Sequence, residues 1–294
     1  MLPRRHIRIK VFQSLYTYSQ KFKHQSFDVK KEFTKNLEAY LHLYNLTIHL
    51  LFSIREIAKE EININKMKLL PKVNDLHPNK RFIQNSILKA VKSKRKYTHI
   101  DNTKIQSISK NIFKKIKKTN IYLEYMQQDK HDQKSEKSLI LKILKNHIII
   151  NEKIHDFIEE HSIYWNDDFL IVYNCLLEKI NNDQNLNIIK LFRHKEDETY
   201  AYMLLEKTIQ NENEINQIIV QLAKNWDQDR IAVSDLIIMR IAITELTHFT
   251  NIPYKVTLDE YIDISKEYSS PKSKEFINGI LDKYIKDILE KKLS

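Results

Sequence analysis

A single glycine, Gly279, is present in the 294 residues of this chain. Average usage of roughly 7% would give a chain of this length about twenty glycines. Tight turns of types I′, II′ and II need residues that accept positive φ, a role that glycine fills most readily. Asparagine could supply some of these turns, and the chain is rich in it. The composition nevertheless favours an all-α protein, because helices can be joined without such turns.

The scarcity of glycine also excludes two common kinds of nucleotide site. A phosphate-binding P-loop and a dinucleotide-binding fingerprint each need several glycines where the backbone approaches phosphate. The single cysteine, Cys175, cannot form a disulfide within the chain or a cysteine-rich zinc site. The twelve histidines show no HExxH motif and no clustered ligand spacing. We therefore expect no cofactor and no bound metal.

The start of the chain carries no sign of a secretory signal. Its first ten residues, MLPRRHIRIK, lack the apolar central region that such a signal needs. The sequence also has no run of eighteen apolar residues, which is the pattern of a membrane-spanning helix. These features predict a cytoplasmic protein without a membrane partner.

The net charge of +11 is unevenly distributed along the chain. Residues 1–19 carry four cations and no acid. Residues 20–194 carry 32 Lys and Arg against 20 Asp and Glu, whereas residues 195–294 carry 13 against 18. A basic front and middle favour a polyanionic partner, and the acidic end could face a basic protein. A lysine-rich solvated surface is the alternative explanation for the middle.

Apolar residues recur with helical spacing along most of the chain. Residues 4–19 predict an amphipathic helix whose buried stripe consists of Ile7, Val11, Ser14, Leu15 and Tyr18. Pro71 and Pro78 mark a break after a long second pattern. The patterns that follow residue 19 cover residues 28–60, 81–94, 103–127, 137–161, 167–182 and 198–224.

The last third of the chain predicts its helices most sharply. Residues 234–249 are apolar almost all round the helical wheel, which predicts a helix at the centre of a bundle. Arg240 and Glu245 lie within that helix, and we expect both to be paired and structural, because buried charges need partners. Thr257 and Glu260 predict a capping box at the start of the next helix. Ser270 or Ser273 is expected to open the last helix.

Three stretches of the sequence belong together: the first is RRHIRIKVFQSLYTY, the second is IMRIAITELTHFTNIPYKVTLDEYIDISKEY, and the third is SKEFINGILDKY, which contains Asn278 and Gly279. Together they resemble the NusB family of transcription antitermination factors. Their order and spacing match the family's arginine-rich first helix, its Leu-Arg-x-Ala-x-x-Glu-Leu helix and its Phe-Val-Asn-Gly-x-Leu-Asp pattern. The resemblance covers residues 1–19 and about 198–290. The long intervening segment is similar to the insertion-bearing branch of the family found in bacteroidetes.

The resemblance implies an all-helical, bacterial, non-enzymatic protein built from two small bundles. It implies binding to boxA, a single-stranded RNA element of rRNA leaders, together with NusE, a protein of the small ribosomal subunit. The resulting complex would join elongating RNA polymerase with other Nus factors, and homodimers occur within the family. The expected organisation is a first core helix in residues 1–19, a helical insertion in residues 20–194 and the remaining core in residues 195–294.

Candidate RNA-binding residues combine cations for phosphate with flat side chains for bases. On the first helix, the resemblance points to Arg4, Arg5, Arg8, Gln13 and Tyr16. Two further groups are Tyr254 and Lys255 in the loop after Pro253, and Lys272, Ser273 and Phe276 at the start of the last helix, where free N–H groups favour phosphate. Asp235 matches an acidic position that the family uses against NusE. For each group the alternative is a structural role: a solvated helix end, an ordinary loop, a packed ring, or an acid that favours a helix start.

The sequence is also compatible with two other functions. One is the RNA-binding module of an rRNA cytosine methyltransferase, which carries a similar domain; binding of S-adenosylmethionine would identify it. The other is an interaction scaffold that has lost RNA binding.

The single glycine, Gly279, raises a separate question, because a glycine within a helix costs about 1 kcal/mol relative to alanine. Close approach of a neighbouring helix or of RNA at Gly279 is expected to offset that cost.

Overall fold

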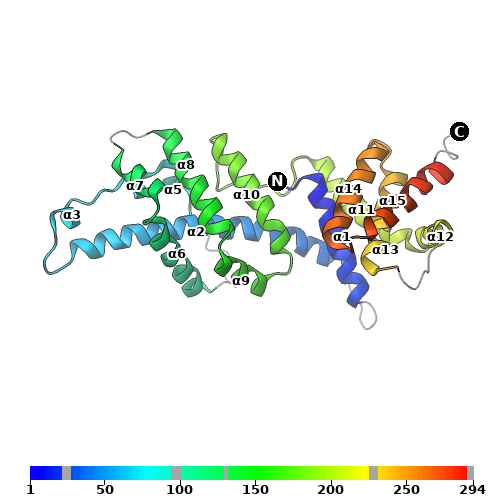
Figure 1. Ribbon diagram of the computed structural model, residues 1–294, viewed down its shortest axis with the longest axis horizontal. Helices are drawn as coiled ribbons and strands as arrows, with labels where there is room; N and C mark the ends of the chain where they lie inside the picture. The colour runs from blue at the N-terminus through cyan, green and yellow to red at the C-terminus, as the bar shows by residue number, and fades with distance from the viewer. Residues whose placement is uncertain (22–27, 94–100, 129–131, 225–230, 290–294) are drawn as a thin grey trace. The chain divides into compact units, whose positions relative to one another are not determined.

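The computed structural model describes residues 1–21, 28–93, 101–128, 132–224 and 231–289. Every regular element in these ranges is a helix, so the all-α prediction is confirmed (Figure 1). The chain forms two compact units. The core unit consists of Leu2–Leu37 and Phe192–Ser294, and the middle unit consists of Met1 and Glu38–Leu191. The division by contacts therefore falls at residues 37 and 192, whereas the sequence places the expected boundaries at residues 19 and 195.

The core unit is assembled around one apolar helix, α13 (Val233–His248). Ten of its sixteen residues are buried, and it packs against five other helices of the unit. The prediction of a central helix over residues 234–249 is thus confirmed, because a helix that is apolar all round must be covered all round. Its neighbours are α1 (Arg4–Lys21), α11 (Lys195–Gln210), α12 (Glu212–Leu222), α14 (Tyr254–Tyr268) and α15 (Ser273–Tyr284).

The first helix, α1, is buried more completely than its sequence predicts. Four members of the expected stripe are buried, whereas the fifth, Tyr18, is only half-buried. The residues His6, Ile9, Lys10 and Phe12, outside the stripe, are buried as well. The Lys10 ammonium donates a hydrogen bond of 2.8 Å to the Asn36 side chain, on the first turns of α2 (Val29–Lys66). A buried ammonium needs such a partner, and α2 supplies it. The start of α2 therefore covers a face of α1 that the sequence pattern assigns to solvent.

The middle unit contains the rest of α2 and a series of shorter helices. Two long-range hydrogen bonds tie α2 to the end of the unit: Tyr44 donates to the Leu186 carbonyl at 2.9 Å, and Trp165 donates to the Ala39 carbonyl at 2.9 Å. The shorter elements are α3 (Val73–Leu76), α4 (Arg81–Gln84), α5 (Ser86–Ala90), α6 (Asn102–Ile116), α7 (Asn120–Gln127), α8 (Gln133–Ile143), the π-helical η1 (Leu144–Ile149), α9 (Glu152–His161) and α10 (Trp165–Asn181).

Two long predicted helices of the middle unit are each divided. The pattern over 103–127 becomes α6 and α7, because the Thr119 hydroxyl accepts the Tyr122 N–H and caps a new helix. The pattern over 137–161 becomes α8, η1 and α9, with Asn151 as the cap of α9. The turn after α2 exposes Met67, Leu69 and Leu70. Among the described residues, no helix has the length and apolarity that crossing a membrane would take.

Candidate nucleic-acid interface

The centre of the core unit is a buried carboxylate, Glu245 of α13, which is fully shielded from solvent. The Arg8 guanidinium donates to both of its oxygens, with Nε at 2.9 Å from Oε2 and Nη2 at 2.8 Å from Oε1. Thr257 and Tyr261 of α14 donate at 2.8 Å and 2.9 Å, and the Tyr200 hydroxyl of α11 also donates. Five hydrogen bonds from three helices thus converge on one side chain. The carboxylate holds α1, α11 and α14 around α13.

Glu245 is charged in this setting despite its burial. Burial alone would raise the pKa of a carboxyl group, but the hydrogen bonds and positive charge of Arg8, with the bonds from Tyr200 and Thr257, hold the Glu245 pKa below its ordinary value. Burial likewise disfavours the charged form of Arg8, yet its pKa is raised, because the bonds to Glu245 outweigh that effect. The pair is therefore a fully ionised, desolvated ion pair.

Arg8 is therefore no longer a candidate RNA-binding residue. Only 3% of the Arg8 side chain is exposed, and its guanidinium is bonded to Glu245. The Arg8 Nη1 also lies 3.6 Å from the Glu260 Oε2. The sequence could not distinguish it from Arg4 and Arg5, because all three lie in one basic run. The expectation that Arg8 contacts phosphate is corrected: its role in this structure is to hold α1 in place.

The predicted capping box at the start of α14 is also wrong. The helix begins at Tyr254, with Pro253 in the preceding position, so Thr257 lies inside its first turns. The Thr257 hydroxyl bonds Glu245 and is not free to cap a helix end. Glu260 does not reach back to a backbone N–H; its buried Oε2 has no hydrogen-bond partner in the described residues and lies 3.6 Å from Arg8 Nη1. Because the helix begins three residues before Thr257, this stretch does not form a capping box.

Arg4 and Arg5 lie at the surface at the start of α1. The Arg4 Nε is 3.0 Å from Asp197, and its guanidinium lies over the Tyr200 ring, 5.2 Å from the ring centroid. Arg5 bonds two acids of α14, Asp263 at 3.1 Å and Glu267 at 3.2 Å. Exposed ion pairs contribute only about 0–1 kcal/mol, so phosphate can compete for these guanidinium groups. The sequence did not indicate these acidic partners, because nothing in it places α14 beside residue 5.

Gln13 and Tyr16 occupy different environments along α1. The Gln13 amide oxygen accepts a hydrogen bond of 3.1 Å from the Asn36 side chain, which ties it to α2. Tyr16 is 41% exposed, and its ring centroid lies 6.0 Å from that of Phe12. Phe12 in turn packs against Tyr268 at the end of α14, at 5.0 Å. Tyr16 thus has an exposed ring that packs against Phe12, the arrangement that stacking with a base requires.

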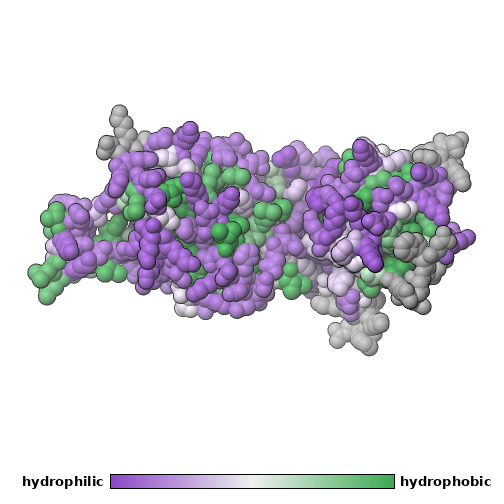
Figure 2. Space-filling view, viewed as in Figure 1, coloured by the Kyte–Doolittle hydropathy of each residue, from purple (hydrophilic) through white to green (hydrophobic). Residues whose placement is uncertain are grey.

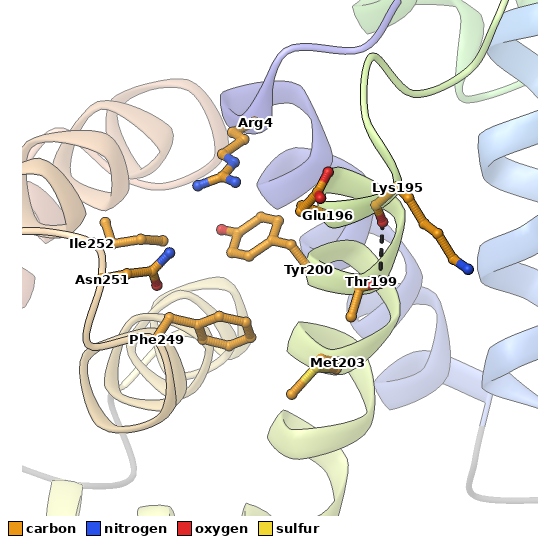
Figure 3. Close-up of a pocket in the computed structure, with 9 residues that line it drawn as sticks. All are labelled: Arg4, Lys195, Glu196, Thr199, Tyr200, Met203, Phe249, Asn251 and Ile252. Atoms are coloured by element: carbon orange, nitrogen blue, oxygen red, sulfur yellow. Dashed lines mark hydrogen bonds between the residues drawn. The ribbon is translucent and has the colours of Figure 1, made fainter.

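A surface hollow of about 350 Å³ opens beside Arg4 (Figure 3). Tyr200 and Phe249 supply aromatic walls, with ring centroids 5.1 Å apart, and the exposed Asn251 supplies an amide. The loop residues Phe249 and Asn251 were not among the sequence candidates, and only their closeness to Arg4 in space draws attention to them. The complete lining consists of Arg4, Lys195, Glu196, Thr199, Tyr200, Met203, Phe249, Asn251 and Ile252.

The junction between α14 and α15 places three candidates in structural positions. Asp235 is buried in the first turn of α13 and accepts hydrogen bonds from Ser269 and from Ser273, the latter at 2.7 Å. The Ser273 hydroxyl is therefore already hydrogen-bonded, and the residue is buried. Phe276 is only 8% exposed and packs inward. The expectations that Asp235 meets a protein partner and that Ser273 and Phe276 meet RNA are corrected, because none of them reaches the surface.

The remaining candidates lie apart from one another. Lys255 is exposed and Tyr254 half-buried at the first turn of α14, whereas Lys272 is exposed just after its other end. Fifteen helical residues separate these ends by roughly 20 Å. Arg240 has a structural role: its guanidinium forms an ion pair with Glu212 at 2.6 Å and donates a hydrogen bond to Asn216 at 2.7 Å. Asn278 donates to Asp282 at 3.1 Å within α15.

Gly279 has no close neighbour in the described residues. A Cβ built on it would meet no atom within 4 Å, and its φ lies outside the left-handed region. The expectation that a neighbouring helix approaches Gly279 closely is therefore wrong. The glycine faces open space on the exposed side of α15.

Comparison with known proteins places this architecture in a family. The sequence model of the NusB family matches residues 169–286. The chain is 36% identical over 111 residues to the transcription antitermination protein NusB of Alkaliphilus oremlandii, which covers 36% of this chain and 80% of that protein. A second relative, NusB of Salinibacter ruber, is 40% identical over 89 residues, covering 30% and 56% respectively. The chain belongs to the NusB family. No solved structure matches it.

Proposed function

We propose that this protein is a cytoplasmic, non-enzymatic transcription antitermination factor that binds boxA-type single-stranded RNA together with NusE. The complex would act on elongating RNA polymerase with other Nus factors. The observation that carries the proposal is the buried bond between Arg8 and Glu245. It fixes the arginine-bearing helix α1 onto α13, which lies within the segment that matches the family. The basic helix is therefore an integral part of the family's fold in this chain.

The surface around α1 has the chemistry that single-stranded RNA needs. Arg4 and Arg5 can neutralise phosphates once they leave their acidic partners, and Tyr16 presents an exposed ring to a base. Beside Arg4, the hollow offers the Phe249 ring and the Asn251 amide where a base next to a bound phosphate would lie. Lys255 and Lys272 add exposed cations at the two ends of α14.

A filter-binding titration of the full chain tests the proposal. The RNAs are a boxA-type sequence and a scrambled sequence of equal length, each with and without NusE. We expect tighter binding of the boxA-type RNA and a further gain in affinity when NusE is present. Equal affinity for the two RNAs, or no effect of NusE, would contradict it. Binding of NusE without any binding of RNA would instead identify an interaction scaffold.

A further inference from the structure

The middle unit contains a helix, α6, with an unusual distribution of charge. Its apolar face is buried and consists of Ile105, Ile108, Ile112, Phe113 and Ile116. Residues 102–118 contain six lysines and no acidic residue. At 100° per residue, Lys110, Lys114 and Lys118 project from the middle of the opposite face, with Lys118 in the turn that ends the helix. All three are exposed, and the surface over α6 is hydrophilic (Figures 1 and 2).

The lysines on the flanks of α6 differ from those in its middle. Lys104 on one flank lies 2.5 Å from Glu160, and Lys117 on the other lies 2.5 Å from Glu61. Lys110, Lys114 and Lys118 form no ion pair with any residue that the structure describes. Acids of neighbouring elements therefore neutralise Lys104 and Lys117 and leave the central row charged. Lys115 lies on the same flank as Lys104, is exposed, and forms no ion pair with the described residues. We call Lys110, Lys114 and Lys118 the α6 lysine row.

Helix stability alone does not explain the α6 lysine row. Lysines near a helix C-terminus interact favourably with the helix dipole, which accounts for Lys114 and Lys118. Lys110 lies outside the last turn, where this effect has fallen away. Like charges four residues apart also repel one another on a helix surface. A single acid four residues from Lys110 would relieve the repulsion, and Gln106 stands there in its place.

We propose that the α6 lysine row is a second RNA-binding surface, which contacts the phosphate backbone without reading bases. Residues four apart on a helix are spaced about 6 Å along its axis, so three point charges follow one another as successive phosphates do. The exposed face of α6 carries no aromatic side chain for a base to stack on. The choice of RNA among polyanions rests on the proposed function of the core unit, but the row lies in the other unit and on different residues.

The test compares two triple variants of the full chain that remove the same charge. Lys110→Gln/Lys114→Gln/Lys118→Gln removes the row. Lys134→Gln/Lys153→Gln/Lys190→Gln removes three other exposed lysines of the middle unit, none of them on α6. The probe is a long single-stranded RNA without a boxA element, titrated by filter binding at several salt concentrations. Melting curves of both variants establish that they are folded.

We expect the row variant to bind this RNA at least about tenfold more weakly at low salt, with a salt slope shallower by about 2, since each lost phosphate contact contributes about 0.7. The control variant should stay within about twofold of the wild type. Equal weakening by both variants would overturn the proposal, since it would show that only overall charge matters. Unchanged RNA affinity with weakened binding of polyglutamate would overturn it in favour of an acidic polypeptide.

The same variants separate this inference from the proposed function. A short boxA-type RNA should bind the row variant as it binds the wild type, because its contacts lie on the core unit. If boxA recognition fails in the wild type while the row variant still loses affinity for the long RNA, the second surface stands without the first.

Discussion

Arg8 on α1 and Glu245 on α13 lie 237 residues apart in sequence and form a buried, two-bond ion pair in the core unit. Their separation spans the entire middle unit. The pair shows that the first helix and the last third of the chain form one structure, although the family model matches only residues 169–286. It also divides the basic run of α1 into a buried arginine that holds the helix and surface arginines that are open to a ligand.

Loss of one partner of this pair should destabilise the protein strongly. Arg8→Ala leaves Glu245 buried without its countercharge, which costs about 3–5 kcal/mol and lowers the melting temperature by about 10 °C. Arg5→Ala is the matched control: its surface pairs contribute about 0–1 kcal/mol, so the melting temperature should barely change. Calorimetry of both variants measures the difference. Similar melting temperatures for the two variants would show that the buried pair does not stabilise the core unit.

Stability of the core unit should depend on pH through Glu245. Its pKa is lowered in the folded state, so its contribution is complete above the unfolded value of about 4.3 and is lost as the pH falls through the folded pKa. Glu245→Gln removes this titration. The gap in melting temperature between wild type and Glu245→Gln should therefore be full at neutral pH and shrink under acid conditions. A gap that stays constant with pH would mean that Glu245 is not ionised in the folded protein.

Asp235 should act on stability and not on partner binding. Asp235→Ala removes the acceptor of Ser269 and Ser273, and the loss of buried hydrogen bonds costs about 1–3 kcal/mol. The expected result is a lower midpoint in urea unfolding, with NusE affinity unchanged below that midpoint. A stable Asp235→Ala variant that loses NusE would restore the interpretation of Asp235 as a partner contact.

The sequence predicted helices and the central position of α13 because these follow from local periodicity. It could not rank the arginines of α1, since burial of Arg8 depends on a carboxylate far along the chain. The capping box at Thr257 failed for the same reason: the hydroxyl bonds Glu245, a partner that local spacing cannot reveal. Asp235 and Ser273 likewise find each other across 38 residues. Long-range polar contacts decided which candidate residues stay at the surface.

Gly279→Ala should stabilise the protein by about 1 kcal/mol, because the position is helical and a Cβ meets no neighbour there. Urea unfolding measures the gain. Filter binding with boxA-type RNA on the same variant then asks why the glycine is present: weaker RNA binding by a more stable protein would indicate that a ligand approaches this face of α15. A destabilised variant would contradict the open surroundings of Gly279.

We propose that RNA binds the core unit through the exposed arginines of α1. Arg4→Ala/Arg5→Ala removes both guanidinium groups from the surface while leaving Arg8 and the buried pair intact. As a control of opposite sign, Asp263→Asn removes an acid that holds Arg5 at 3.1 Å. It should therefore strengthen RNA binding, since phosphate no longer competes with that carboxylate.

The most direct measurement is the affinity of the Arg4→Ala/Arg5→Ala variant for boxA-type RNA, determined by filter binding over a range of salt concentrations. Two lost phosphate contacts should weaken binding and reduce the salt slope by about 1.4, with the melting temperature nearly unchanged. The same affinity and the same salt slope as the wild type would contradict the claim that this face of α1 binds RNA.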